Sequence, residues 1–130
     1  ATSVQAAVSA YGTIDLLWNN AGYQGQIKPL LEYSTEDFQV VMDINVVGAF
    51  NMLKAVAKVM AENGGGSIVN TSSVAGLRGT PAMPAYVASK GAVHGLTMNA
   101  AKDLAPYLIR VNSVSPALIG PDDGFMWKRQ

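Results

Sequence analysis

Tyr86 and Lys90 carry the clearest chemical signal in the sequence. They stand four positions apart in a segment with a helical pattern, so both side chains project from one face within reach of each other. An ammonium beside a phenol stabilises the phenolate and lowers the phenol pKa from about 10 toward the working range. The pair therefore predicts a general acid/base, with a chance surface pair as the alternative interpretation.

Other polar residues stand where the pattern calls for apolar or structural ones. Ser72 and Ser73 follow a predicted strand at its carboxyl end, where ligands of open parallel sheets bind. They lack the Gly-x-Ser-x-Gly surroundings of a hydrolase nucleophile elbow. Asn45 falls within the apolar stripe of a predicted helix, and a buried amide without partners costs about 1–3 kcal/mol. We therefore expect Asn45 to bond backbone groups, a water or a ligand. His94, the only histidine, has no matching ligand set, so no metal site is predicted.

Short segments rich in β-branched residues alternate with two long helical patterns. One helix is predicted from Ser34, with Asp37 completing an imperfect capping box, to the glycines at 64–66. A second helix is predicted from Pro84 to about residue 105. The strands are predicted at residues 14–18, 67–71 and 109–114. This order predicts an α/β fold with a parallel sheet and right-handed crossovers.

Both predicted helices carry surfaces suited to close packing. The first is apolar on more than one side, which favours a second neighbour beyond the sheet, and a helix of another subunit is the natural candidate. A homo-oligomer built through the two helices, a dimer or a tetramer, is therefore expected, with ordinary core packing as the alternative. The stripe predicted to face the sheet is Phe38, Met42, Ala49, Met52, Val56 and Met60, and the small residues of the second helix are Ala88, Ala92 and Gly95.

Composition excludes several classes of function. The 130 residues are 49% hydrophobic, which is enough for a core, and nine basic residues balance nine acidic ones. The basic residues are scattered, so nucleic acid is not an expected partner. Polar residues interrupt every apolar run, so no membrane span is expected. The chain has no cysteine, which fits a cytoplasmic location. Its first eleven residues read as the end of a helix, and we expect the sequence to be part of a longer protein.

Taken in order, these residues resemble the short-chain dehydrogenase/reductase family. The matching features are Asn-Asn-Ala-Gly at 19–22, the helical Asn45, a strand-end Ser73 and the Tyr-x-x-x-Lys of Tyr86 and Lys90. The family spacing of thirteen residues before the tyrosine selects Ser73 over Ser72. The resemblance runs over essentially the whole chain but over only the middle half of a family domain. It implies a Rossmann-like, doubly wound parallel sheet in three α/β/α layers, of which the central and C-terminal half is present.

The resemblance implies a role for each matching residue. Tyr86 would exchange the proton at the substrate oxygen, Lys90 would lower the tyrosine pKa and hold the nicotinamide ribose, and Ser73 would hydrogen-bond the substrate oxygen. Asn45 would anchor a water that relays protons through Lys90. The implied cofactor-binding residues are Asn19, Ala21, Gly22, Tyr86, Lys90, Pro116, Ala117 and Ile119.

Two departures from the family pattern affect cofactor binding. The glycine-rich phosphate loop and the residue that selects NAD or NADP would precede Ala1, so residues 1–130 are predicted to form part of a single NAD(P)-binding domain that lacks this loop and its C-terminal end. After the last strand, Ala117 replaces the usual glycine and Gly120 stands near the place of a threonine. We expect NAD or NADP as the cofactor, with NAD favoured.

The implied function is an NAD(P)-dependent oxidoreductase that moves a hydride between the nicotinamide and a secondary alcohol or ketone. Residues 19–25 and the segment around Phe125, Met126 and Trp127 are similar to family members acting on polyols such as xylitol. The first alternative is a reductase of 3-oxoacyl thioesters or other carbonyls. The second is a non-catalytic nucleotide-binding or interaction module, which the loss of a catalytic residue would favour, and none is lost.

Overall fold

The computed structural model describes residues 2–119. Gly120 and the segment Phe125, Met126 and Trp127, which enter the sequence predictions, lie outside the described residues. The main elements in chain order are α1 (Thr2–Tyr11), β1 (Leu16–Asn19), α2 (Thr35–Met42), α3 (Gly48–Glu62), β2 (Gly66–Thr71), α4 (Pro84–Leu104) and β3 (Ile109–Val114). Short helical turns join them at η1 (Leu30–Glu32), η2 (Asp43–Val47), η3 (Val74–Gly76) and η4 (Ala105–Tyr107).

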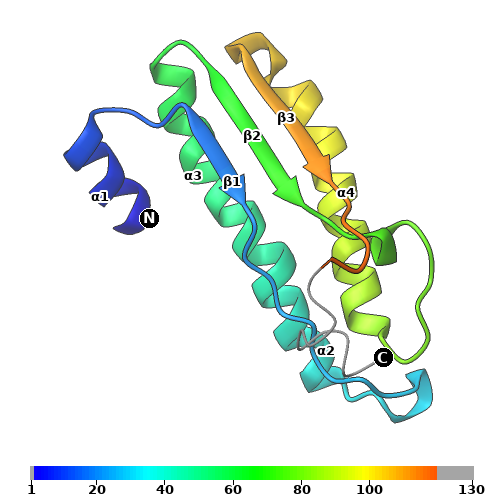
Figure 1. Ribbon diagram of the computed structural model, residues 1–130. Coiled ribbons are helices and arrows are strands. Elements are labelled where there is room, and N and C mark those ends of the chain that lie inside the picture. Colours follow the sequence, from blue (N-terminus) through cyan, green and yellow to red (C-terminus); the bar gives the residue numbers. More distant parts are fainter. Residues whose placement is uncertain (1, 120–130) are drawn as a thin grey trace.

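The three strands form a parallel sheet in the order β1-β2-β3, as the alternation of strands and helices predicts. In this register Leu16 pairs with Ser67, and Gly66 pairs with Ile109. The first strand begins two residues later than predicted and extends to Asn19. Because all three strands run in the same direction, the loops that follow them gather at one edge of the sheet (Figure 1).

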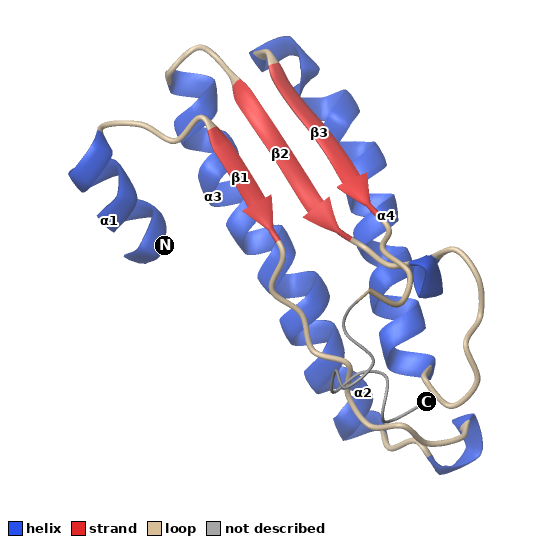
Figure 2. Ribbon diagram, in the orientation of Figure 1, coloured by secondary structure: helices blue, strands red, loops and turns tan. Residues whose placement is uncertain are grey.

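Helices α3 and α4 lie side by side against one face of the sheet (Figures 1 and 2). On the opposite face, Leu16 and Trp18 are 66% and 67% exposed. The described residues thus supply the sheet and one helix layer of the expected three-layer arrangement. Parallel sheets are normally covered on both faces, so the face that carries Trp18 is the place where a third layer would pack.

The hydrophobic core fills the space between the sheet and the two long helices. Met60 and Ile68 are fully buried there, and Val56 and Ile109 are almost so. Burial of side chains of this size, at about 1.5–3 kcal/mol each, is the main source of the fold's stability. The buried residues of this cluster are Val4, Leu53, Val56, Ala57, Met60, Ile68, Ala100, Ile109 and Val111.

The first long helix is interrupted, which the sequence analysis does not predict. Its start is as predicted, because the Ser34 hydroxyl caps it by accepting from the Asp37 amide at 3.1 Å. From Asp43 to Val47, however, the backbone makes a π-helical turn between α2 and α3. A π turn holds more residues than an α turn, so the sheet-facing stripe changes phase across it. Phe38 and Met42, predicted on that stripe, are only half-buried, whereas Val41 is fully buried.

The helical run Thr35–Glu62 is long and apolar enough, by composition alone, to cross a membrane. The sequence pattern does not single out this run, because polar residues such as Asp43, Asn45 and Asn51 interrupt its apolar stretches. In the structure, Leu53, Val56 and Met60 of this run pack on the sheet as part of the core cluster. We assign the run as a core helix, a class that passes the same compositional test.

Candidate active site

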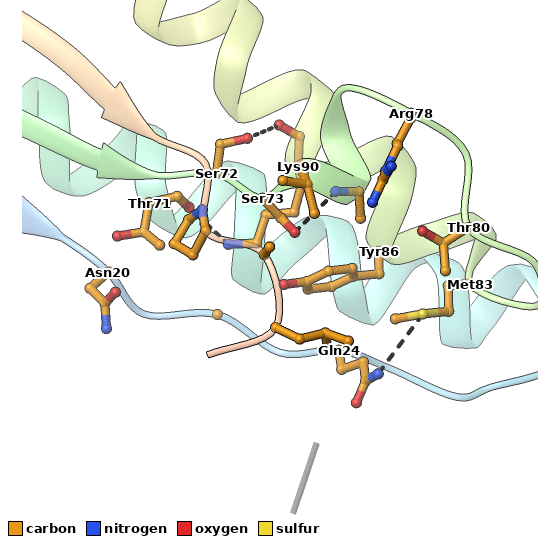
Figure 3. Close-up of a pocket in the computed structure, with 16 residues that line it drawn as sticks. Asn20, Gln24, Thr71, Ser72, Ser73, Arg78, Thr80, Met83, Tyr86 and Lys90 are labelled. Carbon is orange, nitrogen blue, oxygen red and sulfur yellow. Dashed lines mark hydrogen bonds between the residues drawn. The ribbon is translucent and has the colours of Figure 1, made fainter. Parts of the chain in front are cut away.

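A cavity of about 450 Å³ opens at the carboxyl ends of the strands, where the loops after β1, β2 and β3 meet the start of α4 (Figure 3). Parallel α/β sheets bind their ligands at this edge. Several predicted site residues line the cavity together, although they are far apart in the sequence. They are Gly22, Ser73, Tyr86, Lys90, Pro116 and Ala117.

Tyr86 and Lys90 lie one turn apart near the start of α4, as their spacing predicts. The Lys90 ammonium nitrogen lies 5.7 Å from the centroid of the Tyr86 ring. Lys90 is only 4% exposed, and Nζ donates a 2.9 Å hydrogen bond to the carbonyl oxygen of Thr71. Desolvation by burial lowers the Lys90 pKa from its ordinary value. The sheet therefore holds this ammonium against the cavity beside a phenol.

The loop after β2 is packed directly on the backbone of α4 at Lys90. Ser72, which is buried, donates from its hydroxyl to the Lys90 carbonyl oxygen at 2.8 Å. A Cβ on Gly76 would lie 2.6 Å from the Lys90 carbonyl carbon, a distance that no side chain tolerates. Glycine at position 76 thus allows the strand-end loop to approach the helix at the lysine.

Ser72 and Ser73 both line the cavity, but only Ser73 is accessible with a hydroxyl proton that is not already donated within the described residues. Ser73 is half-buried, lines the cavity and begins the short turn η3, where its Oγ accepts from the Ala75 amide at 3.1 Å. A hydroxyl that accepts in this way keeps its own proton to donate. The Ser72 hydroxyl, in contrast, donates to Lys90. This geometry agrees with the choice of Ser73.

Asn45 is buried in the π turn, and its amide is hydrogen-bonded as the sequence requires. Its Oδ1 accepts from the Tyr23 amide at 2.7 Å, while Nδ2 donates to the Tyr23 carbonyl at 2.8 Å and to Ser89 Oγ at 2.9 Å. Ser89 in turn donates to the Tyr86 carbonyl at 2.8 Å. The side chain therefore ties the segment after β1 to the first turns of α4, and its role in a water relay stays a prediction.

The other predicted cofactor residues differ in their placement. Asn19 does not line the cavity, because its Nδ2 donates to the Ala49 carbonyl at 2.9 Å and to Asn70 Oδ1 at 3.1 Å. Ala21 and Ile119 are exposed and also lie outside the lining. His94 is part-buried within 3.4 Å of the Ser113 hydroxyl. Within residues 2–119, no group of three or more potential metal ligands occurs.

Sequence reasoning missed several cavity residues that come from loops. Gln24 follows β1, and Arg78, Thr80 and Met83 lie between η3 and α4. Gln24 falls within the segment 19–25 that enters the family resemblance, but no role is predicted for it, and no periodicity or motif marks the other three positions. Irregular backbone decides which loop side chains face a cavity. Ser89 was also missed, although a polar residue three positions after Tyr86 on the same helix is a readable signal.

The cavity fits the nicotinamide end of a dinucleotide. A Cβ on Gly22 would lie 3.3 Å from Lys90 Nζ, so any larger residue at position 22 would crowd the ammonium. Glycine leaves space beside the Lys90 ammonium, and Pro116 and Ala117 line the same cavity. A cavity of this size suits a nicotinamide and a small substrate.

Comparison with known protein families gives the same assignment. The model for short chain dehydrogenases matches residues 1–125. The chain belongs to the short-chain dehydrogenase family. Among curated relatives of this family, a 3-alpha-(or 20-beta)-hydroxysteroid dehydrogenase of Mycobacterium tuberculosis is 44% identical over 117 residues, which cover 90% of the chain and 45% of the relative. A 3-oxoacyl-[acyl-carrier-protein] reductase of Thermotoga maritima is 43% identical over 116 residues, covering 89% of the chain and 47% of the relative.

Solved structures of short-chain dehydrogenases share this fold in detail. A crystal structure of NAD+-bound xylitol dehydrogenase matches with a TM-score of 0.94 and 53% identity, covering 98% of the chain and 48% of that protein. Other similar solved chains hold NADH or NADP. The chain therefore spans about half the length of the relatives it matches, and a nicotinamide cofactor is supported for this family member.

Proposed function

We propose that the protein to which this chain belongs is an NAD(P)-dependent oxidoreductase that interconverts a secondary alcohol and a ketone. One observation carries the proposal: Ser73, Tyr86 and Lys90 line a single cavity at the ligand-binding edge of the sheet. Two hydroxyls converging beside a buried ammonium suit proton exchange at a carbonyl oxygen. All three residues are present, which disfavours a non-catalytic binding module.

The residues divide the chemistry between proton transfer and positioning. As phenolate, Tyr86 takes the proton from the alcohol during oxidation, and as phenol it returns this proton to the carbonyl oxygen during reduction. Ser73 donates a hydrogen bond to the same oxygen, which stabilises the charge that develops there. Lys90 stabilises the phenolate form of Tyr86 and presents its ammonium to the ribose hydroxyls through the space left by Gly22. The nicotinamide, when bound, accepts or supplies the hydride.

NAD and a neutral polyol are the cofactor and substrate class we favour. The support is the similarity to NAD+-bound xylitol dehydrogenase at 53% identity, which exceeds that to the curated steroid and oxoacyl enzymes. A 3-oxoacyl thioester or another carbonyl compound is the competing substrate class, and it is favoured by the similarity to the Thermotoga reductase.

We also propose that the protein is a homo-oligomer. Helices α3 and α4 border an apolar groove whose lining also includes Lys54, Lys58, Glu62 and Asp103. A surface with both charges can complement its own copy across a two-fold axis. Helices α2, α3 and α4 and the π turn η2 also expose large apolar side chains. These are Val40, Ile44, Val47, Phe50 and Met98.

The test uses the full-length protein. Cofactor fluorescence during titration with NADH and with NADPH measures the affinity for each nucleotide. Nucleotide reduction is then measured with xylitol, a 3-hydroxyacyl thioester and a hydroxysteroid. We expect tighter binding of NADH and the highest kcat/KM with xylitol. Preference for the thioester would move the substrate assignment to the competing class, and cofactor binding without turnover of any alcohol or ketone would overturn the enzyme proposal.

A further inference from the structure

The cavity has two sides, which meet at the Tyr86 hydroxyl. In the view of Figure 3, Lys90, Thr71 and Asn20 lie to one side of this hydroxyl, and Gln24 and Met83 lie to the other. The lysine side is the one that Gly22 leaves open to a cofactor ribose. The part of a substrate beyond its reacting carbon therefore meets the side that contains Gln24.

Gln24 is held there only weakly. Within residues 2–119 its side chain makes one hydrogen bond, from Nε2 to the sulfur of Met83 at 3.9 Å. A thioether is a weak acceptor, so a hydroxyl oxygen in its place would bind the amide more strongly. Gln24 is half-buried and Met83 is 5% exposed, which keeps the amide close to this wall. The amide is thus positioned on the cavity wall with hydrogen-bonding capacity to spare.

The neighbouring polar groups extend the same surface. Arg78 and Thr80 also line the cavity, and Figure 3 shows them on the loop that precedes Tyr86. Gln24 both donates and accepts, the Thr80 hydroxyl does the same, and Arg78 only donates. Hydroxyl groups also donate and accept, so a chain bearing several hydroxyls matches this mixture. A hydrocarbon surface would desolvate these groups without replacing their bonds to water.

We infer that Gln24, with Arg78 and Thr80, forms a subsite that recognises hydroxyl groups of the substrate beyond the reacting carbon. This inference rests on the proposed function and deepens it, because it names the residues that select a polyhydroxylated substrate. The subsite would discriminate against substrates that lack these hydroxyl groups, because its own polar groups would then stay unpaired. Such a mechanism gives stronger selection between substrates than apolar contact does.

The experiment compares substrates that share a secondary alcohol but differ beyond it. Full-length Gln24→Leu and the wild type are assayed with xylitol and with 2-butanol. We expect kcat/KM for xylitol to fall about tenfold or more, because Gln24→Leu removes one good hydrogen bond to the substrate. For 2-butanol, kcat/KM should change less than about twofold. Gln26→Leu is the matched control, because Gln26 is exposed and outside the cavity lining.

Any of the following results would overturn the subsite. An equal loss on both substrates, or none on either, removes the role of Gln24 in selection. The wild type could instead prefer 3-hydroxybutyrate to xylitol and lose this preference in Arg78→Gln. The side of the cavity that contains Gln24 and Arg78 would then be an anion site. Equilibrium binding of xylitol to the NAD-loaded Tyr86→Phe variant supplies a readout that needs no turnover. If the double variant Tyr86→Phe, Gln24→Leu binds xylitol with the same Kd as Tyr86→Phe alone, the subsite is contradicted. Absence of turnover in the wild type contradicts the proposed function instead.

Discussion

Lys90 is anchored to the sheet, because its ammonium donates a 2.9 Å hydrogen bond to the carbonyl oxygen of Thr71, the last residue of β2. The end of a strand thus fixes the position of a side chain that originates on α4. Ser72 and Gly76 hold the helix backbone at the same level. Tyr86 and Lys90 are therefore held by a helix that is fixed to a strand, which is how precise sites are held, and Ser73 is on the loop that packs against this helix.

Replacing Tyr86 by phenylalanine removes only the exchangeable proton. We expect kcat of the full-length protein to fall by about 10²–10⁴-fold, the usual contribution of a positioned acid/base, while NADH affinity stays within about twofold. Steady-state kinetics and fluorescence titration measure the two quantities. Turnover that survives the substitution would exclude Tyr86 as the acid/base.

Lys90 gives stability a characteristic dependence on pH. Burial lowers its pKa in the folded state, so between that lowered value and about 10.4 the unfolded chain binds more protons. The free energy of unfolding therefore rises with pH in this window relative to Lys90→Met. Urea unfolding of both proteins at pH 7 and pH 10 measures the change. We expect no such trend for Lys28→Met, which alters an exposed loop lysine. A gap between wild type and Lys90→Met that is independent of pH would contradict the burial argument.

Gly76→Ala tests the close approach of the strand-end loop to α4. The new Cβ would overlap the Lys90 backbone, so the loop or the helix must shift, at a cost of about 1–3 kcal/mol. Gly79→Ala is the matched control, since a Cβ there meets no atom within 4 Å. Denaturation of both variants measures the cost, and kcat should fall for Gly76→Ala alone. Equal stabilities would show that the contact at Gly76 relaxes freely.

Asn45→Ala leaves both backbone groups of Tyr23 without their side-chain partner. Since Asn45 is 2% exposed, we expect the free energy of unfolding to fall by about 2–4 kcal/mol. Asn63→Ala serves as the control, because Asn63 is exposed and bonds only the Val59 carbonyl of its own helix turn. Chemical denaturation compares them. Similar losses at the two positions would remove the special role of the buried amide.

Phe50→Glu tests the proposed interface between copies. Phe50 is 44% exposed on α3 and lines the groove beside α4. A carboxylate there would lose its hydration on association, so we expect the oligomer to dissociate at micromolar concentration. Sedimentation velocity measures the mass. Leu31→Glu, at a 98% exposed position in η1, should leave the assembly intact. Equal masses for the two variants would place any interface elsewhere.

Several site residues could be predicted from the sequence because they depart from the hydrophobic periodicity of the predicted helices or share a helix face. Asn45 is polar within an apolar stripe, and Tyr86 and Lys90 share a helix face, so periodicity alone places them. The same periodicity failed for Phe38 and Met42, because the backbone hydrogen bonds of a π turn leave no trace in hydrophobic spacing.

Loop residues and close contacts could not be predicted from one sequence. The three glycines at 64–66, the last of which begins β2, have the pattern of a flexible connection. A Cβ on Gly65 would nevertheless overlap the Leu108 carbonyl, and one on Gly66 would overlap Met60. These contacts depend on chain segments that are distant in sequence. The orientation of Gln24 is of the same kind, since it depends on the sulfur of Met83.

The π turn at Asp43–Val47 makes the number of residues in this helical run as important as their identity. Deleting one residue from the regular winding of α2 or α3 would rotate the residues before it by about 100° relative to those after it. A deletion within the π turn has a different effect, because a π turn takes up one residue more than an α turn over nearly the same rotation. Such a deletion would leave α2 and α3 aligned but would remove the turn in which Asn45 is buried and bonded to Ser89. Insertions and deletions in the regular helices on either side are therefore more disruptive than substitutions on their outer surface.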